Sequence, residues 1–237
     1  MRPNKKNKKM KKTLILLFVT ALGAGTMSSC SKSNKGKLSG EWTINSYSTT
    51  YAQTSGNPSV TNTEVMTLNG STITSVSSSS SAGAVTSTEN GTVAAATWNI
   101  EKDGTWTRII DMTFTVTEPT YSFSNQNVTT ESGTWSFVGK NKTADLKKNE
   151  RVVMSTLSSS STVNSTYTVG GVSSTDTSTD TQTYSEGEYA ETFLIVESKS
   201  KELSLSQVGA STSTSTDSNG TTTSSSTADA AIVLTQE

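Results

Sequence analysis

Residues 98–117 read WNIEKDGTWTRIIDMTFTVT, and this stretch decides the fold class. On both sides of a central Lys-Asp-Gly, apolar and polar side chains alternate at every second position. A period of two is the pattern of a β-strand with one buried face and one face in water. Asp103-Gly104 is a strong hairpin signal, because both residue types tolerate the positive φ angles of tight turns. The stretch therefore predicts a long antiparallel hairpin.

The same alternation recurs through the rest of the chain and predicts an all-β protein. Strands are expected at residues 38–47, 64–68, 71–76, 92–100, 105–117, 121–123, 133–137, 150–157, 158–169, 190–197, 202–207 and 230–234. Roughly ten short strands between turn signals, with no convincing helix after the leader, favour an antiparallel meander β-barrel. Phe193–Val196 is apolar at every position, so both faces are expected to be buried there. Residues 173–182 and 211–226 are rich in Ser and Thr and are expected to form long loops.

The charges divide the chain into a basic leader and an acidic remainder. Seven Lys and Arg side chains and no acidic residue precede residue 30. Without those seven, 12 of the 19 basic residues remain against 20 acidic ones, a net charge of −8. An acidic body argues against nucleic acid as a partner. The chain has no His, the commonest general base and metal ligand. With no acid–base or metal-ligand constellation in view, a protein without enzymatic activity, metal or cofactor is expected.

Residues 1–29 have the features of an export signal. The apolar run Leu14–Ala24 follows a basic segment and is too short for a membrane-spanning helix, which needs about 20 residues. Met27-Ser28-Ser29-Cys30 resembles the lipobox of bacterial lipoproteins. That resemblance implies cleavage before Cys30 and acylation of Cys30, the only Cys in the chain. The alternative is an ordinary secretory signal followed by an incidental Cys.

These features predict three segments: a signal peptide at 1–29, a tether at 30–37 and a barrel domain at 38–237. In lipoproteins of the Bacteroidota type, acidic residues just after the Cys resemble a surface-export signal. No acidic residue stands at 31–37. The resemblance therefore implies an outer-membrane lipoprotein of a bacterial envelope, on the periplasmic face in preference to the cell surface.

Gly40-Glu41-Trp42 resembles the opening motif of the lipocalins and of the bacterial lipocalin-like lipoproteins. The resemblance implies a barrel that binds a small apolar or amphipathic molecule. In lipocalins this Trp closes the bottom of the barrel beneath an Arg from a late strand. Here the arginines after the leader are Arg108 and Arg151, and neither lies near the C-terminus. The Thr-Asp-Tyr motif of classic lipocalins is also missing, so the resemblance is to the looser bacterial group.

Four residues are candidates for ligand contact: Trp98, Trp106, Arg108 and Trp135. Arg108 shares the parity of Trp106 and Ile110, so it falls on the face predicted to be buried. An Arg inside a barrel can bind a carboxylate, and it can also lie at the barrel mouth or pack on an aromatic neighbour. The tryptophans can line a ligand cavity or simply fill the core.

Two functions from different classes remain open. The first is a lipid-anchored barrel that binds a small apolar or amphipathic ligand. The second is a structural module of the envelope with a filled core, which contacts a protein or a glycan through its Ser/Thr-rich segments. The interior discriminates between them, because a ligand site needs a cavity of about 300 Å³ or more lined by Trp98 or Trp106.

Overall fold

The computed structural model describes residues 35–55, 60–81, 86–139, 150–217 and 220–236. The chain divides into two compact units, Met1–Cys30 and Ser31–Glu237. The described residues all belong to the second unit. The predicted leader, Cys30 and the tether up to residue 34 lie outside them, as do residues 140–142 of a turn expected at 139–142.

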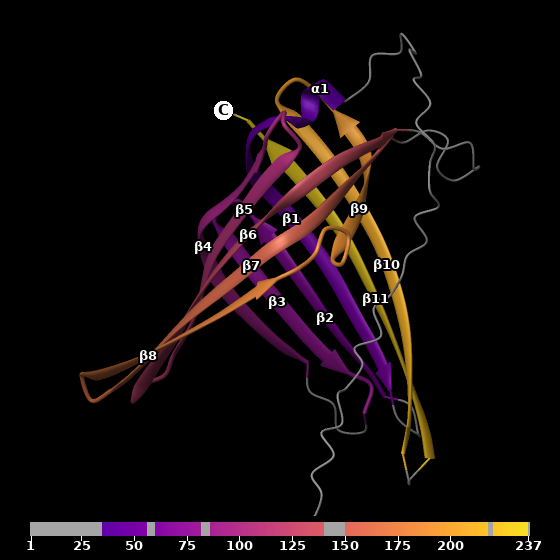
Figure 1. Ribbon diagram of the computed structural model, residues 1–237. Coiled ribbons are helices and arrows are strands. Elements are labelled where there is room, and N and C mark those ends of the chain that lie inside the picture. Colours follow the sequence, from indigo (N-terminus) through magenta and orange to yellow (C-terminus); the bar gives the residue numbers. More distant parts are fainter. Residues whose placement is uncertain (1–34, 56–59, 82–85, 140–149, 218–219, 237) are drawn as a thin grey trace, which may run out of the picture. The chain divides into compact units, whose positions relative to one another are not determined.

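Eleven strands form one antiparallel sheet in the described part of the chain (Figure 1). A short helix, α1 (Lys35–Leu38), precedes them. In chain order the strands are β1 (Gly40–Ser55), β2 (Val60–Asn69), β3 (Thr72–Ser79), β4 (Ser87–Ile100), β5 (Thr105–Thr117), β6 (Tyr121–Gly139), β7 (Glu150–Val169), β8 (Val172–Thr183), β9 (Ala190–Ser198), β10 (Glu202–Asp217) and β11 (Gly220–Thr235). The order across the sheet is β6-β5-β4-β3-β2-β1-β11-β10-β9-β7-β8, and β6 also pairs with β7. Ten strands therefore close into a ring, with β8 beside it. The predicted all-β, barrel-like fold is confirmed.

The hairpin of β4 and β5 forms where the sequence predicts it. Ile100 pairs with Trp106 and Trp98 with Arg108 across the two strands. Gly104 has a φ of 98°, and the Asp103 carboxylate accepts a hydrogen bond of 2.9 Å from the Thr105 amide. Alternation holds in the first half of β5 and then fades. Val116, expected on the inner face, is 44% exposed.

The ring narrows at one end because the β2–β3 hairpin is short. Its two-residue turn is Gly70-Ser71, one position later than the predicted Asn69-Gly70, and Gly70 takes the positive φ of 58°. Beyond this turn β1 pairs directly with β4, from Gly40–Ile100 to Thr43–Thr97. At this end the ring therefore consists of eight strands, because β2 and β3 do not reach it. An eight-stranded ring has an interior that side chains can fill.

The buried core occupies this narrow end, which we call the tryptophan end because it holds all four tryptophans. Its larger members are Leu38, Trp42, Ile44, Ile100, Val152, Met154, Phe193, Ile195, Leu203, Leu205, Ile232 and Leu234, together with Trp98, Trp106 and Trp135. Leu38 comes from α1 and is fully buried. Residues 35–37, the last ones of the predicted tether, lead directly into this core. They form a helical turn whose final side chain, Leu38, joins the core.

Strands β6 and β7 are longer than predicted. The expected short strands at 121–123 and 133–137 are parts of one 19-residue strand, β6. Those at 150–157 and 158–169 are parts of one 20-residue strand, β7. The polar middle of β6 carries no apolar alternation, yet it is paired with β5 on one side and β7 on the other. Pairing on both sides satisfies its backbone groups and keeps it extended.

The prediction of a loop at 173–182 is wrong, because these residues belong to β8. Gly170 and Gly171 have φ angles of 56° and 81°, the two positive values of a type I′ hairpin turn. A row of side-chain hydrogen bonds, 2.7–3.2 Å long, joins β7 and β8, and we call it the hydroxyl ladder. Its rungs are Thr168–Ser173, Thr166–Thr175, Asn164–Thr177, Thr162–Thr179 and Ser160–Thr181.

Two further expectations are corrected. Residues 211–226 were expected to leave the sheet as a loop, but the backbones of β10 and β11 continue to pair as far as Asp217 and Gly220. In β9 only one face is buried. Phe193 and Ile195 lie in the core, whereas on the opposite face Leu194 is only half-buried and Val196 is 58% exposed.

Candidate functional site

The three tryptophans predicted to contact a ligand are packed into the core. Trp98 is 0%, Trp106 2% and Trp135 8% exposed. The Trp98 ring meets Trp106 edge to face at 5.9 Å between centroids, and Phe193 from β9 at 5.7 Å. Edge-to-face contacts of this kind stabilise the core beyond simple burial. Of the two alternatives for these residues, core packing is what the geometry supports.

Backbone carbonyls at the tryptophan end accept hydrogen bonds from three of the four indole groups. Trp42 Nε1 donates to the Leu38 carbonyl at 2.8 Å, Trp106 Nε1 to Thr134 at 2.9 Å and Trp135 Nε1 to Glu101 at 2.8 Å. These bonds tie the side chains to α1, to β6 and to the turn between β4 and β5. Trp98 Nε1 is buried with no hydrogen-bond partner among the described atoms.

Arg108 lies directly above the tryptophan core and its charge is already paired. Its Nε donates to Glu131 Oε2 at 2.7 Å, and its Nη2 contacts the same oxygen. Glu131 is its register partner on β6. The Arg108 Cζ also lies 5.0 Å from the Trp98 ring centroid and 5.9 Å from that of Trp106. Arg108 therefore packs on aromatic neighbours, as one of the sequence alternatives held, and a ligand carboxylate would have to displace Glu131.

A second carboxylate approaches Arg108 from across the ring. Glu191, near the start of β9, lies 3.8 Å from Arg108 Nη2. The side chains of Arg108, Glu131 and Glu191 are each less than a quarter exposed. Side chains from the consecutive strands β5 and β6 and from the distant strand β9 thus converge on one charged layer, which we call the Arg108 cluster.

The electrostatics of the Arg108 cluster keep the arginine charged. Burial alone would lower the pKa of the Arg108 guanidinium, but the Glu131 and Glu191 carboxylates outweigh it and the pKa is raised. Burial also raises the pKa of the Tyr47 hydroxyl, against a smaller opposing effect of a hydrogen bond with Thr49. Tyr47 lies on β1 and packs against the core, and the charges of the Arg108 cluster also affect the pKa of its hydroxyl. The arrangement holds these charges in place above the core.

Sequence reasoning missed Glu131 and Glu191. Glu131 lies in the part of β6 that was not expected to be a strand, although it shares odd parity with Gly133 and Trp135. Continuing that parity backwards would have placed Glu131 on the inner face, but not beside a particular residue of β5. Glu191 shares parity with Phe193 and Ile195, but nothing local shows that β9 faces β5 across the ring.

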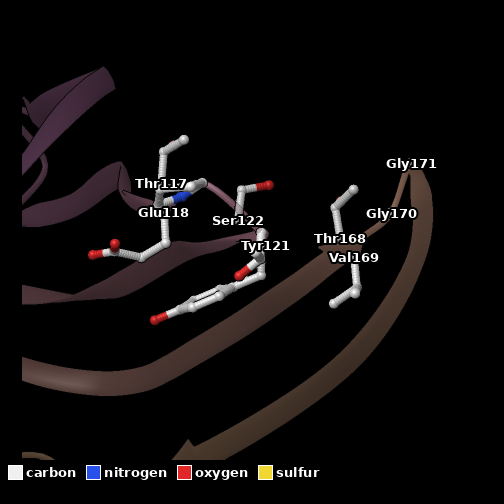
Figure 2. A pocket seen from close by; sticks show the side chains of 10 residues that line it. Thr117, Glu118, Tyr121, Ser122, Thr168, Val169, Gly170 and Gly171 are labelled. Atoms are coloured by element: carbon white, nitrogen blue, oxygen red, sulfur yellow. The ribbon is translucent and has the colours of Figure 1, made fainter.

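Two surface hollows are formed away from these residues. The first, of about 550 Å³, is lined by residues 117–122 and 168–171, at the β5–β6 and β7–β8 turns (Figure 2). The second, of about 360 Å³, is lined by Tyr51, residues 62–64 and residues 77–79. Neither includes Trp98, Trp106, Arg108 or Trp135. The residues predicted for ligand contact and the hollows are therefore separate features.

No family model, curated protein or solved structure matches this chain. Among residues 35–55, 60–81, 86–139, 150–217 and 220–236, no helix is both long and apolar enough to cross a membrane. Over the same residues, no three His, Cys, Asp or Glu side chains are grouped to hold a metal ion.

Proposed function

We propose that this chain is a lipid-anchored, non-enzymatic module of a bacterial cell envelope. Its barrel is a filled scaffold, and its hairpins and outer surface make the contacts with a partner. The proposal rests on the burial and the pairing of the residues that were predicted to contact a ligand. The tryptophans fill the core, and Arg108 is paired with Glu131.

The envelope location rests on the sequence. A basic segment, a short apolar run and Met27-Ser28-Ser29-Cys30 resemble a lipoprotein signal. Several acyl chains on one Cys anchor a protein stably, whereas a single chain binds a membrane only weakly. The resemblance to Bacteroidota lipoproteins supports the outer membrane, and the lack of acidic residues at 31–37 favours its periplasmic face over the cell surface.

The surface of the β7–β8 hairpin supports an interaction role. Every side chain of β8 is exposed. On one face β8 presents only the Ser and Thr side chains of the hydroxyl ladder, and its two carboxylates, Asp176 and Asp180, both lie on the opposite face. A strand that buries nothing contributes little to the core, so a surface role accounts better for its length.

The anchor is tested with the full-length protein expressed in a bacterium that acylates lipoproteins. We expect the wild type in the membrane fraction, with a mass that includes acyl chains on Cys30. The Cys30→Ser variant should be soluble after export. A Cys30→Ser protein that stays in the membrane fraction would refute the anchor.

The filled barrel is tested against the lipocalin-like alternative, in which the interior binds a small apolar molecule. Full-length protein in detergent is titrated with the fluorescent probe 1-aminoanthracene, and native mass spectrometry searches for a bound small molecule. We expect no saturable binding and no co-purified ligand. One-to-one binding that quenches tryptophan fluorescence would favour an interior ligand site and overturn the filled scaffold.

A further inference from the structure

The hollow at the β5–β6 and β7–β8 turns is built from two hairpin ends held side by side. Tyr121 at the start of β6 pairs with Val169 at the end of β7. The Glu118 amide donates to the Tyr121 carbonyl at 2.8 Å, which closes a turn over Pro119-Thr120. Figure 2 shows Glu118 and Tyr121 on one side of the hollow and Thr168 to Gly171 on the other.

An exposed aromatic pair lies at this hollow. Tyr121, which lines it, is 37% exposed, and Tyr167 beside it is 48% exposed. Their ring centroids are 5.8 Å apart and the rings are tilted by 37°. Contiguous exposed apolar surface, as opposed to scattered single side chains, is a feature of sites that meet a partner. Aromatic side chains of this kind offer a flat apolar surface with a polar hydroxyl at its edge.

The rest of the lining combines apolar groups, Pro119 and Val169, with hydroxyls, and it contains no cation. Thr117, Thr120, Ser122 and Thr168 carry hydroxyls, and Glu118 carries the only charge. A hydroxyl both donates and accepts hydrogen bonds, and a carboxylate accepts up to four. Gly170 and Gly171 have open space where a side chain would stand, so their backbone groups can be reached. Without Lys, Arg or His in the lining, an anionic ligand would find no partner for its charge.

We propose that this hollow binds a neutral saccharide, an inference that rests on the proposed function and names its partner chemistry. A pyranose ring has an apolar face of C–H groups, which packs on the Tyr121 ring, and a rim of hydroxyls. The Glu118 carboxylate accepts from that rim, and the threonine hydroxyls exchange hydrogen bonds with it. A volume of about 550 Å³ accommodates one or two sugar rings.

The test uses the full-length protein in a detergent without a sugar headgroup. The probes are gluco-, manno-, galacto-, xylo- and N-acetylglucosamine oligosaccharides, followed by saturation-transfer NMR and titration. Choline chloride serves as the cationic probe. We expect at least one neutral oligosaccharide to bind. Tyr121→Ala should weaken that binding about tenfold or more, through loss of the ring surface, and Glu118→Gln should also weaken it.

Tyr51→Ala is the matched control, because Tyr51 is 42% exposed and lines the second hollow. It should bind the oligosaccharide as the wild type does. Circular dichroism checks that each variant keeps its sheet, and Tyr121→Phe, which retains the ring, should retain binding. The inference is overturned if no oligosaccharide binds, if Tyr121→Ala binds normally, or if choline binds instead. Those results leave the anchor and the filled barrel untouched, since these are measured on Cys30→Ser and with 1-aminoanthracene.

Discussion

At the scale of single residues, the position of Arg108 on an apolar strand face most needs an explanation. A guanidinium on the apolar face of a strand is costly unless its charge is met. Here Glu131 and Glu191 meet the charge and Trp98 accepts the flat face of the group. The cluster covers the tryptophan core with groups that are mutually satisfied, so its primary effect is on stability.

Arg108→Met should destabilise the fold by about 3–5 kcal/mol, because it leaves two poorly solvated carboxylates without a counter-charge. Urea unfolding of the full-length protein measures this. The double variant Arg108→Met/Glu131→Leu should recover much of the loss. Lys199 pairs with Glu197 and Glu202 in water, and Lys199→Met, the exposed control, should change nothing measurable. An Arg108→Met protein as stable as the wild type would contradict the cluster's structural role.

Tyr47 makes the stability of the fold depend on pH in the alkaline range. Burial raises the pKa of its hydroxyl above the ordinary value of 10.0. The folded state therefore favours the neutral phenol. This contribution to stability is complete below pH 10 and is lost as pH rises through the higher pKa of the folded state, since the unfolded chain ionises first.

Tyr47→Phe keeps the ring and removes the titrating group. The urea midpoint of the wild type should fall more steeply than that of Tyr47→Phe above about pH 10. Tyr189, whose pKa is also raised by burial, is present in both proteins and cancels in the comparison. Parallel pH profiles for the two proteins would show that Tyr47 does not titrate differently on folding.

At the scale of elements, the β7–β8 hairpin shows why a Ser/Thr-rich stretch need not be a loop. Low hydrophobicity predicts disorder when burial is the only source of order. In β8 the order comes from a Gly-Gly turn, from the β-preference of Thr and from the cross-strand pairs of the hydroxyl ladder. None of these requires an apolar face.

Thr175→Ala/Thr179→Ala removes two rungs of the hydroxyl ladder. Each rung contributes about 0.2–1 kcal/mol, so amide hydrogen exchange in β8 should quicken about twofold to thirtyfold. The global unfolding midpoint should hardly move, because β8 buries no side chain. Ser174→Ala/Ser178→Ala, on the opposite face of the same strand, is the control. Equal exchange in both double variants would mean that the ladder does not hold β8 in place.

At the scale of the whole molecule, stability depends on closing the ring. The last strand, β11, lies between β1 and β10, and its Ile232 and Leu234 are buried in the tryptophan end. Strands β6 and β7 complete the other junction. The pairing of β1 with β11 joins segments distant in sequence, and non-local pairing of this kind makes folding slow.

A chain that ends at Asp217 should therefore fail to fold cooperatively. It lacks β11, leaves β1 and β10 with an unpaired edge each and removes two core side chains. The loss exceeds what a domain with a total stability of about 5–15 kcal/mol tolerates. Urea unfolding followed by tryptophan fluorescence is the measurement, with the full-length chain as reference. A sigmoidal transition at the full-length midpoint would show that closure through β11 is dispensable.

The sequence by itself determined the class of fold and the inward face of most strands near the tryptophan end. Alternation with a period of two is a local property, and it holds wherever one face is buried, as it is from Trp98 to Ile110. The same signal is missing where both faces are polar, which is why the middle of β6, all of β8 and the outer halves of β10 and β11 were not predicted as strands.

Tertiary structure alone decided which side chains meet. The pairing of Arg108 with Glu131 and Glu191, the narrowing to eight strands and the hollow between two hairpin turns all depend on register and ring closure. Alternation indicates whether a residue faces inward. It carries no information about which strand lies opposite, because that choice depends on the pairing of every strand in the ring at once.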